Sequence, residues 1–301
     1  MDFFIQQFCN GLTTGGIYAL IALGYTMVYG VMKLINFAHG ELFTLGAFLG
    51  YLLLVTLGLA GAVGPALGLA LSIVTVSGLV AAAGHLLERV AYRPLRNSDR
   101  LAAVVSALGA SIFLQNAIMI VWGSQYRAYS ARLLPAVSLD VLGQPIPLIR
   151  ILVFAAAAAL MLLLWLFINR TRTGLAIRAA AIDQGAARLM GIDVSRVIAV
   201  VFVIGPALGG LAGLMAGLLY GQINFNMGQL YGLKAFTAAI IGGIGNIQGA
   251  MIGGLLLGLL ESLGAAYVSV AWKDAITFVV LIMILVVRPT GLLPERVAEK
   301  L

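Results

Sequence analysis

Charged residues are scarce in this chain of 301 residues: only 10% are Asp, Glu, Lys or Arg, and 62% are hydrophobic. A soluble globular domain carries about 25% charged residues, which keep its surface hydrated. The scarcity of charge therefore excludes an ordinary water-soluble domain and predicts a chain embedded in a lipid bilayer. The 37 glycines agree with this class, because small residues let helix backbones approach closely in lipid.

Several functional signatures are also missing. Cys9 is the only cysteine, so no intrachain disulfide can form. No Lys or Arg precedes the first apolar run, so the basic start of a cleavable signal is absent and we expect that run to stay in the mature protein. The two histidines lie far apart, and there is no metal-ligand spacing, catalytic triad or phosphate-binding loop. We therefore expect no enzymatic activity, metal or cofactor, and any ATP-driven motor would have to be another chain.

Apolar segments follow one another along the chain, which predicts an all-α protein that crosses the membrane many times. Residues 234–266 resemble one segment, but 33 helical residues at about 1.5 Å each would overshoot a hydrocarbon core of roughly 30 Å. Glycines and polar residues between Gly242 and Gly249 divide it into a short broken span and a full one. The nine expected spans are residues 4–32, 41–58, 66–84, 101–122, 149–168, 197–220, 234–245, 248–265 and 274–288.

The basic residues set the expected orientation. Twelve of the 18 lysines and arginines fall in residues 85–100, 169–196 and 288–300. Loops rich in Lys and Arg stay in the cytoplasm, so these regions should share that side, and the net charge of +7 is no sign of nucleic-acid binding. With the N-terminus outside, nine crossings place all three regions inside. The sequence thus predicts a single transmembrane domain, residues 1–301, with a cytoplasmic C-terminus.

A long polar loop, residues 123–148, is then expected on the outer side of the membrane. Residues 137–149 alternate loosely around Leu142-Gly143-Gln144-Pro145, which predicts a small β-hairpin there.

Two stretches of the chain read almost alike. Residues 35–48 and 223–236 are identical at eight of 14 positions, and each interrupts an apolar region with polar residues and glycine. Under the predicted topology the two copies have opposite orientation, as in transporters built from inverted repeats, whose broken helices surround the transport site. The alternative is a chance similarity in a chain rich in glycine and leucine, since the likeness fades outside this window.

Polar residues at these breaks are the candidates for a substrate pathway, because such groups at membrane depth are costly and tend to face cavities or partners. Asn36 and Asn224 can alternatively be interpreted as helix caps. Glu41 can alternatively be explained by the favourable dipole at a helix start. Lys234 and Glu261 are expected either as buried contacts or as side chains reaching the membrane surface. The pathway candidates are Asn36, His39, Glu41, Asn224, Gln229 and Asn246.

Residues 169–196 contain a predicted amphipathic helix. Its apolar residues recur at steps of three and four, Thr173 is placed to cap its start, and Gly191 to end it. Such a helix either lies on lipid headgroups or acts as a rigid lever in a partner's cleft. The apolar face comprises Leu175, Ala179, Ile182, Ala186 and Leu189.

Three regions of the sequence resemble one known family. They resemble, in order and spacing, motifs of the permease family of branched-chain amino acid ABC importers, and they comprise residues 15–24 with 35–41, residues 174–194, and residues 232–246. The length and the N-terminus resemble those of the shorter permease subunit of this family. The resemblance covers nearly the whole chain. It implies a multi-pass protein of the bacterial inner membrane, paired with a second permease subunit, two cytoplasmic ATP-binding subunits and a periplasmic substrate-binding protein.

The resemblance also implies that residues 174–191 contact an ATPase subunit and that leucine, isoleucine and valine are substrates. Related permeases carry urea, short amides or other amino acids, so these stay open. An ion-coupled secondary transporter and a passive channel are rival classes; the first usually needs an intramembrane carboxylate or cation site, for which only Glu41 and Glu261 qualify. The residues implied in coupling are Gly174, Arg178, Asp183, Arg188 and Gly191.

Overall fold

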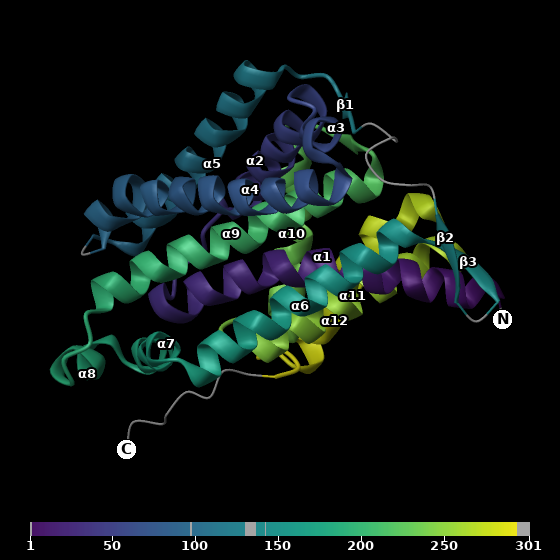
Figure 1. Ribbon diagram of the computed structural model, residues 1–301. Coiled ribbons are helices and arrows are strands. Elements are labelled where there is room, and N and C mark those ends of the chain that lie inside the picture. Colours follow the sequence, from purple (N-terminus) through teal and green to yellow (C-terminus); the bar gives the residue numbers. More distant parts are fainter. Residues whose placement is uncertain (1, 97, 130–136, 142, 294–301) are drawn as a thin grey trace.

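The computed structural model describes residues 2–96, 98–129, 137–141 and 143–293. The chain forms a bundle of long helices with two small antiparallel strand pairs (Figure 1). The long helices are α1 (Asp2–Met32), α2 (His39–Tyr51), α4 (Pro65–Leu87), α5 (Arg100–Trp122), α6 (Leu148–Arg170), α9 (Val194–Tyr220), α10 (Met227–Gly242), α11 (Ile247–Tyr267) and α12 (Lys273–Val287). The short helical elements are η1 (Leu52–Thr56), α3 (Leu59–Val63), η2 (Glu88–Tyr92), η3 (Arg93–Leu95), α7 (Arg172–Ile182), α8 (Gln184–Leu189) and η5 (Val270–Trp272). Strands β1 (Arg127–Ala128) and β4 (Gln222–Ile223) pair, as do β2 (Ser138–Val141) and β3 (Gln144–Pro147).

Helices α1 and α9 form the centre of the bundle. They run antiparallel, since the Thr14 hydroxyl lies 3.4 Å from that of Tyr220 while Gly24 faces Gly205 further along. Most of their apolar residues are buried, which requires neighbours on several sides of each helix. Glycines at the contact let the two backbones approach closely.

Helices α4, α5, α6 and α12 lie at the periphery and expose large apolar side chains. Val74 is 70% exposed, Phe113 71% and Val286 78%. In water such a surface would drive aggregation, whereas in lipid it needs no cover. Within the described residues, eight helical segments are long and apolar enough to span a membrane, as expected for a polytopic α-helical membrane protein.

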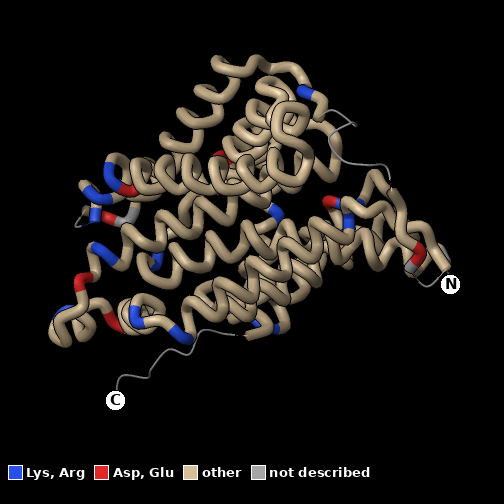
Figure 2. The backbone as a smooth tube through the Cα atoms, viewed as in Figure 1, with Lys and Arg blue, Asp and Glu red and all other residues tan. Residues whose placement is uncertain are grey.

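The two ends of the bundle differ in charge (Figure 2). Residues 33–38, 88–96 and 171–196 meet at one end. There the Arg96 guanidinium donates to the Ser195 hydroxyl, and the Gln184 amide donates to the Val31 carbonyl. We call this the basic end. The start of α1 and the β2–β3 hairpin lie at the opposite end, and this hairpin confirms the one predicted in residues 137–149. Residues 294–301, part of the third basic region, lie outside the described residues.

Two expected elements differ from the structure. Helix α10 begins at Met227, seven residues before the predicted span, because the polar residues before Lys234 already lie in helix. Residues 174–191 form two helices instead of one. The backbone at Asp183 is extended, and the Asp183 carboxylate accepts from the amides of Gly185 and Ala186, which caps α8 and breaks the predicted helix.

Candidate functional site

The two copies of the repeat lie against each other in the middle of the bundle. Gly40 in α2 and Gly228 in α10 occupy the same position of the repeat, and a Cβ on either would overlap the backbone of the other. Three residues further along the two copies, the matching Phe43 and Tyr231 are stacked with ring centroids 5.1 Å apart. A local two-fold axis between the two copies would bring matching positions into contact in this way.

Helices α2 and α10 run in opposite directions from this contact. Helix α2 lies parallel to α9, with Gly46 beside Gly210 and Gly50 beside Leu214. Helix α10 lies parallel to α1, as the ring contacts of Tyr231 with Tyr18 and of Phe236 with Tyr25 show. Since α1 and α9 are themselves antiparallel, the two repeat helices diverge toward opposite ends of the bundle.

The same local turn starts both helices. The Asn36 side-chain oxygen accepts from the Ala38 amide at 3.1 Å, and the Asn224 oxygen accepts from the Asn226 amide at 2.8 Å. Such turns let an asparagine side chain replace a backbone acceptor where the chain reverses. The interpretation of Asn36 and Asn224 as helix caps is therefore wrong, because neither side chain caps its helix. Each instead stabilises the turn before its helix.

Three of the predicted pathway residues are buried in the first copy. Asn36, His39 and Glu41 are at most 3% exposed, and Asn36 also accepts from the Tyr92 hydroxyl at 2.8 Å. The His39 ring lies against the backbone of Gly24, eight residues before the end of α1, so α2 begins well inside the bundle. One carboxylate oxygen of Glu41 is buried without a hydrogen-bond partner among the described residues.

The second copy is more open. Asn224 and Gln229 line a cavity of about 570 Å³ at the start of α10, together with Tyr220, Tyr231 and Lys273. This volume lies within the range of about 300–1,000 Å³ that is usual for small-molecule sites. Asn246 is not part of this region: it caps α11 at the far end of α10 by accepting from the amides of Gln248 and Gly249. The six pathway candidates therefore do not form one cluster.

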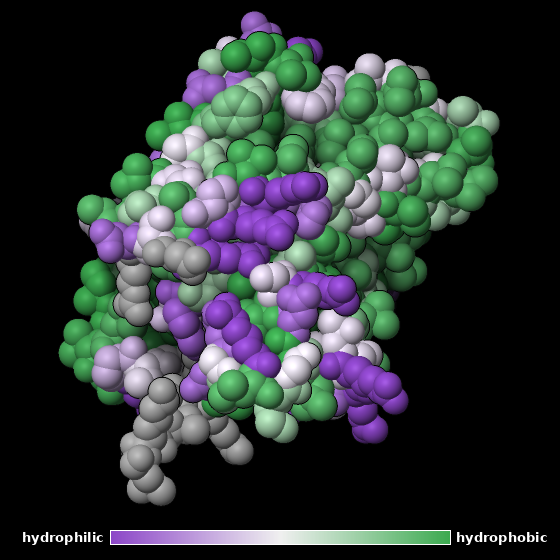
Figure 3. Space-filling model, turned by 90° about the vertical axis from the view of Figure 1, so that its left-hand side faces the viewer, coloured by the Kyte–Doolittle hydropathy of each residue, from purple (hydrophilic) through white to green (hydrophobic). Residues whose placement is uncertain are grey.

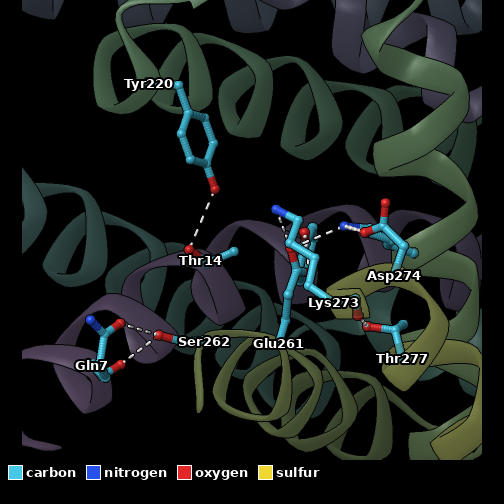
Figure 4. A network of polar contacts seen from close by, with 10 residues as sticks. Gln7, Thr14, Tyr220, Glu261, Ser262, Lys273, Asp274 and Thr277 are labelled. Carbon is cyan, nitrogen blue, oxygen red and sulfur yellow. Dashed lines mark hydrogen bonds and ion pairs between the residues drawn. The ribbon is translucent and has the colours of Figure 1, made fainter. Parts of the chain in front are cut away.

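An ion-pair network around the buried Lys234 and Glu261 joins α10, α11 and α12 (Figure 4). The Lys234 ammonium is 3.0 Å from the Glu261 carboxylate and 2.6 Å from that of Asp274, and Lys273 is 2.9 Å from Glu261. The Tyr18 hydroxyl donates to Glu261 at 2.7 Å. Lys234 and Glu261 are thus buried contacts and do not reach the membrane surface. Charges removed from water persist only when paired in this way.

Neighbouring residues of this network were not predicted. Lys273, Tyr220, Thr14 and Gln7 line a second cavity, of about 240 Å³, beside Glu261. These residues come from three helices, with Gln7 and Thr14 on α1, Tyr220 on α9 and Lys273 on α12, and no local spacing in the sequence connects the three helices.

The residues expected to take part in coupling lie at the basic end, on α7 and α8 and in the turns next to them. Thr171, and not Thr173, caps α7 by accepting from the Gly174 amide, whereas Gly191 ends α8 with a positive φ of 82° as predicted. The predicted apolar face is largely exposed: Leu175 is 59% exposed, Ile182 65% and Leu189 90%. The bundle instead buries Gly174, Ile177, Ala180 and Ala187.

Comparison with known proteins places these features in a family. The family described as "Branched-chain amino acid transport system / permease component" matches residues 7–285. The high-affinity branched-chain amino acid transport system permease protein BraD of Pseudomonas aeruginosa is 44% identical over 301 residues, which cover 99% of this chain and 98% of BraD. LivH of Salmonella typhimurium, a permease protein of the same description, is 44% identical over 306 residues with the same coverage.

More distant similarities extend to other import systems. The ribose import permease protein RbsC of Escherichia coli is 28% identical over 271 residues, covering 86% of this chain and 78% of RbsC. Among solved structures, PsaBC from Streptococcus pneumoniae in complex with Fab is similar with a TM-score of 0.48 and 15% identity, over 92% of this chain and 89% of that chain. The nearly full-length similarity to BraD and LivH and the match over residues 7–285 show that the chain belongs to the family of branched-chain amino acid transport system permease components.

Proposed function

We propose that this chain is the permease subunit of an ATP-driven importer that carries branched-chain amino acids across the bacterial inner membrane. The nearly full-length identity of 44% to the BraD and LivH permeases is the observation that carries this proposal. The chain itself does not hydrolyse ATP; two cytoplasmic ATP-binding subunits do, and a periplasmic binding protein delivers the substrate.

The proposed topology is a single transmembrane domain, residues 1–301, with nine crossings and the N-terminus outside. The direction of α10 supports this topology. Helix α10 starts near the Tyr220 end of α9 and runs toward the other end of the bundle, where glycines precede α11. With 16 residues, α10 is about 24 Å long, too short to span alone, but the turn at residues 221–226 extends the path. The abundance of arginine at the basic end favours the cytoplasm for that side.

The translocation path is proposed to run between this chain and the second permease subunit, near the start of α2 and α10. A leucine-like substrate needs an apolar path with a few polar anchors. Asn36, His39, Glu41, Asn224 and Gln229 supply polar groups near that point. Asn246 is proposed only as a distant part of the same pathway.

Residues 169–196 are proposed as the coupling segment. Closure of the ATP-binding subunits would push α7 and α8, and the motion would reopen the path. The exposed apolar side chains Leu175, Ile182 and Leu189 support contact with a protein partner, since apolar groups gain by leaving water. Gly174 and Gly191 lie within this segment, and Arg178, Asp183 and Arg188 lie between them.

Replacing Asp183 separates two roles of this residue. Asp183→Ala removes the cap of α8, whereas Asp183→Asn keeps a good capping group but removes the charge. If coupling needs the shape of α8, only the alanine variant should uncouple ATP hydrolysis from uptake. Normal coupling in Asp183→Ala would contradict the proposed role of this break.

Transport in a defined system tests the proposed function. The tagged chain is isolated with its bound subunits, placed in liposomes and supplied with ATP, the binding protein and radiolabelled leucine, urea, acetamide or glutamine. Leucine uptake that requires ATP is expected. Uptake without an ATPase subunit, driven by an ion gradient, would favour the secondary transporter, and preference for urea or amides would revise the substrate.

A further inference from the structure

A basic cavity of about 630 Å³ lies at the basic end, between the end of α1, η3, α8 and the start of α9. It lies outside the repeat contact and outside the two cavities near Lys273. Figure 3 looks onto this end of the molecule, where hydrophilic side chains gather among the helix ends. The lining residues are Met32, Leu34, Arg93, Arg96, Gln184, Arg188, Ser195 and Ile198.

The three arginines of this cavity are not equivalent. Arg96 forms an ion pair with the buried carboxylate of Glu88 and donates to Ser195, so its charge is compensated. Arg93 and Arg188 have no hydrogen bond or ion pair to any other described residue. Both residues are exposed. Because a guanidinium remains charged at every physiological pH and carries five N–H donors, the cavity presents two positive groups that can bind an anion.

The other lining groups are arranged around these arginines. The Ser195 hydroxyl accepts from Arg96 at 3.1 Å, which leaves its own proton free to donate. The Gln184 amide donates to the Val31 carbonyl at 2.6 Å and holds α8 against the end of α1. Met32, Leu34 and Ile198 add an apolar wall. A small inorganic anion would not use this wall, whereas a phosphate joined to a glycerol and acyl chains would.

We propose that this cavity binds the phosphate group of an anionic phospholipid, with Arg93 and Arg188 on the phosphate and the apolar wall against the glycerol and first acyl carbons. Basic cavities between helices at the cytoplasmic surface suit such headgroups. The assignment to the cytoplasmic leaflet rests on the proposed orientation. Since Arg93 follows α4 and Arg188 lies on α8, the lipid would link the bundle to the coupling segment.

Lipid binding to the purified full-length chain tests this proposal. The chain is held in a neutral detergent, and affinity is measured by native mass spectrometry with phosphatidylglycerol, phosphatidylcholine and inorganic phosphate. Each basic side chain near an anionic surface contributes about fivefold in affinity. Arg93→Gln and Arg188→Gln should each weaken phosphatidylglycerol binding about fivefold, and the double variant about 25-fold.

Arg170→Gln serves as the control, since Arg170 is exposed at the end of α6 and does not line the cavity. It should change the affinity less than about twofold. The double variant should melt as the wild type does in the absence of lipid, because neither guanidinium has a partner there to lose.

Two results would overturn the proposal. They are unchanged phosphatidylglycerol affinity in the double variant and equal binding of inorganic phosphate by the wild type. None of these measurements depends on transport or on sidedness, so their failure is distinct from failure of the proposed function.

Discussion

Phe43 of α2 stacks on Tyr231 of α10 with ring centroids 5.1 Å apart, and the two residues occupy the same position of the sequence repeat. Gly40 and Gly228 match and touch one turn earlier. The repeat therefore describes a physical contact as well as a similarity in sequence. Two short helices start at this contact and diverge, which lets polar residues occupy the middle of an otherwise apolar bundle.

The close approach of Gly40 to Gly228 leaves no space for a side chain. Gly40→Ala should reduce stability by about 1–3 kcal/mol, as overpacking does, and should abolish transport because the two backbones must separate. Thermal melts of the purified chain and uptake in liposomes measure both effects. Gly109→Ala in α5 is the control, since nothing lies within 4 Å of the added carbon. A Gly40→Ala variant that melts and transports like the wild type would refute the contact.

The two repeat asparagines should respond differently to alanine. Asn224→Ala loses one hydrogen bond and should cost about 1 kcal/mol. Asn36→Ala also leaves the buried Tyr92 hydroxyl without its acceptor, which adds about 1–3 kcal/mol.

Tyr92→Phe provides the test of this explanation. Because removal of both partners is nearly neutral, the variant Asn36→Ala/Tyr92→Phe should be more stable than Asn36→Ala alone, as judged by denaturant melts. Equal stability of the two would show that the Tyr92 hydroxyl is satisfied elsewhere.

Removing one charge from the buried network should be costly. Lys234→Met leaves Glu261 and Asp274 with less compensation and should destabilise the chain by about 3–5 kcal/mol. Adding Glu261→Gln should recover part of this loss, measured as a double-mutant cycle. Arg196→Gln is a control, because the Arg196–Asp193 pair is exposed and such pairs contribute less than about 1 kcal/mol. A fully additive cycle would mean that the two buried residues do not interact.

The exposed apolar face of the coupling segment predicts a separation of stability from activity. Leu189→Gln should leave the melting temperature of the isolated chain unchanged, since Leu189 is 90% exposed, and should weaken binding of the ATPase subunits. Ile177→Ala should instead lower the stability of the isolated chain, by about 2–5 kcal/mol, because Ile177 is buried. Wild-type ATPase binding by Leu189→Gln would place the partner contact elsewhere.

Much of the architecture could be predicted from local patterns. The apolar segments marked the long helices, and the repeat identified two related helix starts, because both signals lie within short stretches of sequence. Helix α10 was predicted to start late because its first residues are polar and glycine-bearing, which resembles a loop. Asp183 was misread because an aspartate is compatible with both a helix face and a cap, and only its backbone conformation decides.

Contacts between distant elements could not be predicted in this way. Lys234 and Glu261 lie 27 residues apart on different helices, and their pairing depends on how α10, α11 and α12 pack. The exposure of the apolar face of the proposed coupling segment could not be predicted either, because periodicity identifies an apolar face but does not show whether other residues cover it. The cavity at Arg93 and Arg188 unites segments nearly 100 residues apart and has no local signature.

The central claim is that α2 and α10 are oppositely directed, so that nine crossings bring Leu293 to the side of the basic loops. Single cysteines at Ser98, Leu189, Val268 and Leu293, in a background with Cys9→Ser, can be labelled with a membrane-impermeant maleimide in vesicles of both orientations. The account predicts that positions 98, 189 and 293 label only in inside-out vesicles and that position 268 labels only in right-side-out vesicles. Labelling of position 293 together with position 268 would contradict it.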